Sequence, residues 1–132
     1  DPTGRFTYWV QRVAAGGEVL APGAPERQVQ HIDVRDAATW IVQMAEARAT
    51  GVFHVTGPDA RLSMGEFLAA CQQALQRDVR LTWVPESVLI EHKVTPYTEL
   101  PLWVPAEAAG FDRFDISRAL AANEITLKTT LA

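Results

Sequence analysis

Residues 51–67 of the sequence read GVFHVTGPDARLSMGEF, and this stretch combines the two strongest local signals in the chain. Its first seven residues are β-branched and aromatic between two glycines, which favours a short strand over a helix. Ser63 and Glu66 then have the spacing of a capping box, which satisfies the free amides at the start of a helix. The stretch therefore predicts a strand over residues 52–56, followed by a helix over residues 64–76.

Helices and short strands also alternate on the N-terminal side of this stretch. Apolar residues three and four positions apart indicate one buried face of a helix, and Pro and Gly mark the turns between elements. The predicted elements are a helix over residues 4–15, strands over residues 18–21 and 28–32, and a helix that Asp33 caps, whose periodic face carries Ala37, Trp40, Ile41, Met44 and Arg48.

The C-terminal side continues the alternation. Four side chains form the buried face predicted for the helix over residues 64–76: Phe67, Leu68, Cys71 and Leu75. Beyond it we expect a strand over residues 79–84, a short helix over 85–91, an irregular Pro-rich segment over 94–112 and a helix over 116–122 that Asp115 caps. Strands that alternate with helices indicate an α/β or α+β fold rather than a helical bundle.

Composition and charge exclude several classes of protein. The chain has 132 residues, 48% of them hydrophobic and 21% charged, which suits a single ordinary domain. Twelve Lys and Arg against sixteen Asp and Glu leave a net charge of −4 without a basic stripe, so we expect neither nucleic acid nor a membrane as a partner. The single Cys71 cannot form an intrachain disulfide, and we expect a buried, inert thiol in a cytoplasmic protein.

Motifs that carry catalysis are missing from the sequence. It contains no G-x-G-x-x-G turn, phosphate-binding loop, H-E-x-x-H motif or G-x-S-x-G elbow, so no catalytic, cofactor-binding or metal-ligating residue is predicted. His31 and Asp33, with Asp36 beyond them, are suitable ligand types for a metal, but no third ligand has motif spacing, and helix capping explains both acids. We expect His54 to be a hydrogen-bonded core histidine and His92 to be a surface residue.

The order of these pieces resembles the C-terminal half of the extended short-chain dehydrogenase/reductases, the NAD(P)-dependent epimerase/dehydratase family. The resemblance covers residues 1 to about 128. It is carried by the first helix, the turn A-P-G at 21–23, the stretch H-I-D-V-R-D-A-A at 31–38, the strand G-V-F-H-V-T-G and the helix S-M-G-E-F.

The resemblance implies an α/β fold that forms the C-terminal substrate-binding lobe of an extended Rossmann-type reductase, with short strands, packed helices and no N-terminal Rossmann sheet. Residues 1–132 are then a single lobe of a longer, bacterial-type NAD(P)-dependent reductase or epimerase. The family's Tyr-x-x-x-Lys pair is missing, since the residue four positions after Tyr8 is Arg12 and the residue four positions after Tyr97 is Pro101. NAD or NADP would bind the parent's Rossmann domain, while this chain alone would bind no cofactor and be inactive.

Two consequences of the resemblance concern partners. The expected partners are a small-molecule substrate and the N-terminal Rossmann domain of the same parent chain. The strand over residues 52–56 would join the sheet of that domain. In the isolated chain its unpaired edge would drive self-association. A non-catalytic binding or oligomerisation domain is the alternative interpretation of the sequence.

The register of the resemblance bears on the substrate. Matching residues 36–38 to the family's Asp-apolar-Ala places Val29 where nucleotide-sugar epimerases have a phosphate-binding arginine. The alternative register, which matches His31 to the family histidine, places Arg27 there but puts Val34 on the aspartate. We favour the first because an acid at the start of a helix is stabilised by the helix dipole. A smaller aromatic or carbonyl substrate is then favoured over a nucleotide sugar.

Six residues are candidates for contact with that substrate. The aromatic ones could supply an apolar pocket wall, although packing in the core or at a domain interface is the alternative role for each. The candidate substrate-binding residues are Arg5, Trp9, Arg27, His31, Tyr97 and Trp103.

Overall fold

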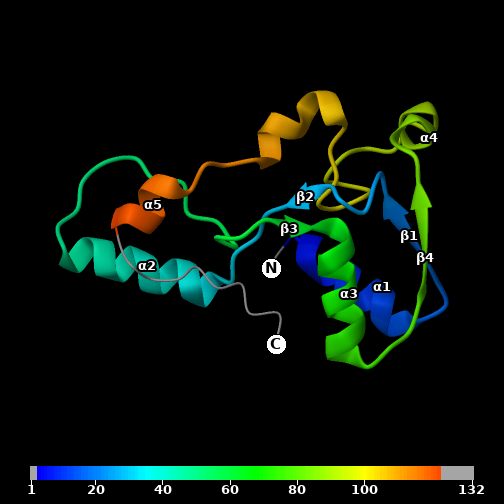
Figure 1. The fold of residues 1–132 in the computed structure, drawn as a ribbon, viewed down its shortest axis with the longest axis horizontal. Coiled ribbons are helices and arrows are strands. Elements are labelled where there is room, and N and C mark those ends of the chain that lie inside the picture. The colour runs from blue at the N-terminus through cyan, green and yellow to red at the C-terminus, as the bar shows by residue number, and fades with distance from the viewer. Residues whose placement is uncertain (1–2, 123–132) are drawn as a thin grey trace.

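The computed structural model describes residues 3–122, apart from the side chains of residues 111 and 112, and shows a mixed α/β fold (Figure 1). Helices α2 and α5 lie at one end of the molecule, and β1, β4, α1, α3 and α4 lie at the other. The elements in order are α1 (Arg5–Ala15), β1 (Glu18–Pro22), β2 (Gln28–Val29), α2 (Val34–Glu46), β3 (Leu62–Ser63), α3 (Met64–Leu75), β4 (Arg80–Val84), α4 (Glu86–Glu91), the 3-10 helix η1 (Ala106–Asp112) and α5 (Ser117–Ala122).

The larger core is built on a parallel pair of strands. β1 and β4 pair from Glu18 opposite Arg80 to Pro22 opposite Val84, and α1 packs against α3 beside them. Parallel strands need a long crossover, and here the chain between β1 and β4 holds α2 and α3. The largest fully buried side chains of this core are Trp9, Trp103, Phe67, Met64, Leu68, Val13 and Val19.

A second, smaller core joins α2 to α5. Trp40 and Met44 of α2 are buried against Ile116 and Ala119. The Trp40 indole N–H donates to the Ala119 carbonyl over 3.3 Å, and its ring meets the Phe53 ring edge-on at 5.4 Å. The end of the molecule that holds α2 therefore has a core of its own.

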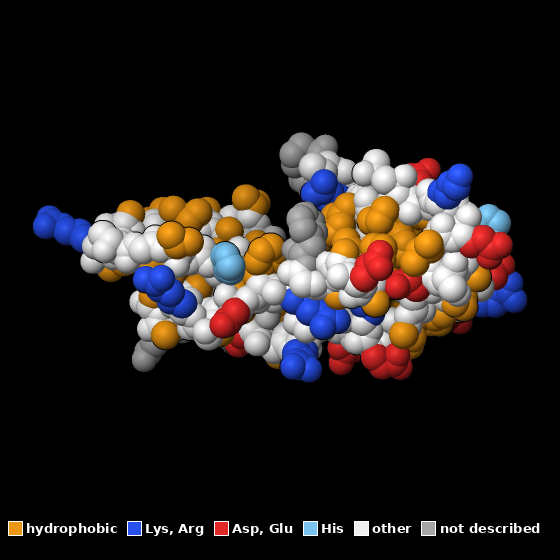
Figure 2. Space-filling model, turned by 90° about the horizontal axis from the view of Figure 1, so that it is seen from above, with side chains coloured by type: hydrophobic (Ala, Val, Ile, Leu, Met, Phe, Trp, Pro, Cys, Tyr) orange, Lys and Arg blue, Asp and Glu red, His pale blue; other side chains and the backbone are white. Residues whose placement is uncertain are grey.

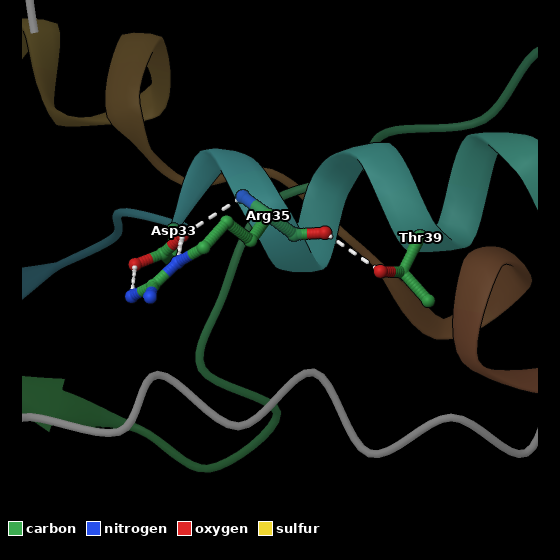
Figure 3. A network of polar contacts seen from close by, with 3 residues as sticks. All are labelled: Asp33, Arg35 and Thr39. Atoms are coloured by element: carbon green, nitrogen blue, oxygen red, sulfur yellow. Dashed lines mark hydrogen bonds and ion pairs between the residues drawn. The ribbon is translucent and has the colours of Figure 1, made fainter.

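The start of α2 shows how local sequence sets a helix boundary (Figure 3). The Asp33 carboxylate accepts the Arg35 amide over 2.8 Å and also pairs with the Arg35 guanidinium, while the Thr39 hydroxyl donates to the Arg35 carbonyl. These hydrogen bonds from Arg35 hold the pKa of the Asp33 carboxyl well below its usual range. The predicted cap is confirmed.

All five predicted helices are confirmed, and so is the capping box. The Ser63 hydroxyl accepts the Glu66 amide over 3.1 Å, and the Glu66 carboxylate accepts the Ser63 amide over 2.8 Å. Asp115 likewise accepts the Ser117 amide at the start of α5. No described helix could cross a membrane, since α2, the longest of them, has only 13 residues.

The predicted strand over residues 52–56 is wrong. In the described part of the chain, the only backbone hydrogen bond of residues 51–57 runs from the His31 amide to the Gly57 carbonyl, 2.9 Å away. A strand needs a neighbour that accepts and donates along its length, and none of the described strands lies beside this segment. The strand predicted over residues 28–32 is also shorter than expected. Only Gln28 and Val29 pair with β3, so β2 ends at Val29.

Two predictions about burial are also wrong. His54 is exposed rather than a core histidine, because the segment that carries it is not inside a sheet. Ile41 is 59% exposed, because α2 turns only the face with Trp40 and Met44 toward α5.

Candidate functional site

Four hollows on the surface could hold a ligand, and three of them are charged. These three share Arg113 and have volumes of about 740, 500 and 450 Å³. Each also contains carboxylates: Glu26 and Glu86 in the first, Glu26 and Glu66 in the second, Asp59 and Asp115 in the third. The first and third hollows each have two arginines and two carboxylates, and the second has three arginines and two carboxylates, so all three are mixed in charge.

The fourth hollow, which we call the aromatic pocket, differs in chemistry. It has a volume of about 280 Å³, and no Asp, Glu, Lys or Arg is among the described residues that line it. Four of its seven lining residues carry a ring. The lining is Gln30, Phe53, His54, Val55, Thr56, Tyr97 and Phe114.

Gln30 holds one wall of the aromatic pocket in place. Its side-chain amide donates to the Phe114 carbonyl over 3.0 Å and accepts the Phe114 amide over 2.8 Å. This pair of bonds imitates the contact between two strands, so it fixes the backbone of residue 114 beside β2. The Phe114 ring then meets His54 edge-on, with 5.0 Å between ring centres.

Tyr97, another lining residue of the aromatic pocket, is held by a tight turn. Its backbone is left-handed, with φ of 58°, a conformation that costs energy for a residue with a side chain. Hydrogen bonds around the turn compensate: the Tyr97 amide donates to the Trp103 carbonyl, and the Thr95 amide donates to the Glu99 carboxylate. The Arg5 guanidinium lies 5.2 Å from the centre of the Tyr97 ring and does not line the pocket. The structure therefore brings Arg5 and Tyr97 together, as two of the six candidates.

His31 lies outside this pocket in an aromatic cluster. Its ring is 5.3 Å from Phe6 of α1 and 5.4 Å from Phe67 of α3, centre to centre. Burial among these rings lowers the pKa of the imidazole, because a low-dielectric surrounding disfavours its charged form.

The lowered pKa of His31 predicts a loss of stability in mild acid. The unfolded chain binds the proton first, so the free energy of unfolding should fall as the pH drops below about 6.5 and level off below the folded pKa. Chemical denaturation between pH 7.5 and pH 5 measures this slope. The variant His31→Phe should flatten it, whereas His92→Gln, at an exposed histidine, should leave it unchanged. An equal slope in all three proteins would contradict the assignment.

Three other candidates are placed away from the aromatic pocket. Trp9 and Trp103 are fully buried in the larger core, so neither presents its ring to a ligand. The Trp9 indole N–H donates to the Pro101 carbonyl over 3.0 Å, which is a packing role. Arg27 donates to the Val104 carbonyl and lines two of the charged hollows.

Sequence reasoning missed Gln30, His54 and Phe114 as candidates. Gln30 and Phe114 are 84 residues apart, and nothing in the local pattern of either pairs them. His54 was detectable as a titratable residue, but the expectation of a strand assigned it to the core.

Metal and thiol chemistry find no support in the described residues. No group of three or more His, Cys, Asp or Glu in residues 3–122 could hold a metal ion. Burial raises the pKa of the Cys71 thiol, which agrees with the predicted inert role.

Comparisons with known proteins return no relatives. No family model matches the chain, and no curated protein and no solved structure is similar to it.

Proposed function

We propose that residues 1–132 form the substrate-binding lobe of an NAD(P)-dependent reductase or epimerase and act only when docked on a cofactor-binding domain of the same parent chain. The order of sequence pieces described above motivates this proposal. One observation in the structure supports it: α2 is apolar on two faces, and among the described residues only one of these faces is covered.

The uncovered face of α2 is a continuous stripe. Val34, Ala38, Ile41, Val42 and Ala45 are all exposed and recur at helical spacing, and Val34 and Ile41 are 77% and 59% exposed. The opposite face already packs on α5 through Trp40 and Met44. A helix that is apolar on both sides belongs between two packed layers.

Hydrophobic side chains are correspondingly visible on the surface of the part that holds α2 and α5 (Figure 2). Val52, in the irregular segment beyond α2, is 78% exposed. The backbone of residues 51–56 forms no hydrogen bond with the described chain, so it has amides and carbonyls available to a partner sheet. Both features favour a folded domain as the partner of the exposed stripe on α2 and of the backbone edge beside Val52.

The starts of α2 and α3 are poorly suited to hold the dinucleotide. A pyrophosphate binds free amides at a helix N-terminus, but the Asp33 carboxylate already accepts the Arg35 amide of α2, and the Ser63 hydroxyl accepts the Glu66 amide of α3. In this proposal the docked domain holds the cofactor, which would supply the hydride. The residues of this chain would bind and orient the substrate and exclude water from it.

The proposal is tested by comparing the chain alone with the longer polypeptide. Titration calorimetry should detect binding of NAD or NADP to the longer polypeptide and none to residues 1–132. In the longer polypeptide, Ile41→Asp should lower nicotinamide-dependent turnover at least tenfold, because a buried unpaired carboxylate disrupts docking. Ile90→Asp is the matched control: Ile90 on α4 is 51% exposed, and its replacement should leave turnover unchanged.

Two outcomes would overturn the proposal. Micromolar cofactor binding by residues 1–132 would place the dinucleotide site within this chain. A stable dimer of residues 1–132 that Ile41→Asp dissociates, together with no nucleotide binding by the longer polypeptide, would identify an oligomerisation domain instead.

A further inference from the structure

We infer that the aromatic pocket binds the ring of a neutral aromatic ketone or aldehyde. This inference rests on the proposed function and names the substrate class of that lobe.

The charge of the ligand follows from the lining of the pocket. The other three hollows contain Arg113 and carboxylates, whereas the described residues that line the aromatic pocket include none of the four charged types. A charged ligand in such a pocket would lose hydration without an ion-pair partner among these lining residues. A neutral ligand avoids this cost.

The shape of the ligand follows from the rings. Tyr97, Phe53 and Phe114 line a pocket of about 280 Å³, slightly below the usual size of small-molecule sites. The Arg5 guanidinium supports Tyr97 and the Arg118 guanidinium lies 4.8 Å from the centre of the Phe53 ring, so both rings are held by contacts outside the pocket. A flat ring gains edge-on and offset contacts with such walls that a puckered ring of equal area does not.

The polar group of the ligand follows from the donors. Thr56 and His54 line the pocket and carry hydrogen-bond donors, and the Gln30 amide is already engaged with Phe114. One carbonyl oxygen on the ligand would accept from these donors. Acetophenone combines a flat ring with such a carbonyl.

Binding of three probes to residues 1–132 tests the inference. The probes are acetophenone, its saturated counterpart cyclohexyl methyl ketone, and the anion benzoate, each followed by ligand-observed NMR and titration calorimetry. Acetophenone should bind about fivefold more tightly than the saturated ketone, which is the effect of one favourable aromatic pair. Benzoate should bind more weakly than acetophenone.

Two variants locate the binding. Phe114→Leu keeps an apolar side chain and should remove the preference for the flat ring, since Phe114 is 45% exposed and its ring contributes to the wall. Trp83→Leu removes a ring from the largest charged hollow and should leave the preference intact. Equal affinity for both ketones, tighter binding of benzoate, or an equal effect of Trp83→Leu would each overturn the inference.

The result is separable from the test of the proposed function. If residues 1–132 bind the aromatic ketone but the longer polypeptide has no nicotinamide-dependent turnover, the inference about the aromatic pocket stands and the proposed reductase function is refuted. If the longer polypeptide catalyses nicotinamide-dependent turnover but residues 1–132 show no preference for the flat ring, the proposed reductase function stands and the inference about the aromatic pocket is refuted.

Discussion

Replacing Trp103 with alanine is expected to lower the free energy of unfolding by about 3–5 kcal/mol, the usual effect of deleting a buried tryptophan side chain. Trp103 is fully buried in the larger core, and Leu100, Leu102 and Val104 beside it are buried too. The segment therefore passes through the core and cannot close over the cavity that the substitution leaves. Urea denaturation followed by circular dichroism measures the change.

The matched control for Trp103→Ala is Ile41→Ala. Ile41 is exposed on α2, so its truncation should change the free energy of unfolding by less than about 0.5 kcal/mol. The comparison decides between the two roles that the sequence left open for Trp103. A pocket wall would lose ligand contacts with little effect on stability, and a small change in unfolding for Trp103→Ala would contradict the core assignment.

Replacing Trp40 with alanine is expected to release α2 from α5 without unfolding the larger core. Among the described residues, four buried hydrophobic side chains form the smaller core, and Trp40 supplies both the contact with Phe53 and the hydrogen bond to the Ala119 carbonyl. Deleting a buried tryptophan side chain costs about 3–5 kcal/mol. The remaining contacts of the smaller core are too few to hold α2 against α5 after this loss. Hydrogen exchange should show lost protection for the amides of α2 and α5 and retained protection for those of α1 and α3.

Val42→Ala is the control for this prediction, because Val42 lies on the same helix and is 55% exposed. It should leave the exchange pattern unchanged. Uniform loss of protection across all four helices in Trp40→Ala would show that the two cores unfold as one cooperative unit.

The candidate site was less predictable than the helices that surround it. Tyr97 and Arg5 were identified as site residues from the sequence, and the structure brings them into contact. The wall that completes the aromatic pocket depends on the Gln30 amide and the Phe114 backbone, which no local pattern connects. The presence of aromatic residues in the sequence does not show which of them line a pocket. Trp9 and Trp103 are buried because α1, α3 and the segment around residue 103 pack together.

The sequence by itself determined where the helices start, because a cap joins atoms only two or three residues apart, as in Asp33 with Arg35 and Ser63 with Glu66. The tertiary structure alone decided whether residues 52–56 pair as a strand and which tryptophans are buried. A β ladder needs hydrogen bonds from a neighbouring strand, and the Trp9 side chain bonds a carbonyl 92 residues away. Neither partner is encoded in the residues around these positions, so only the folded arrangement of distant segments supplies them.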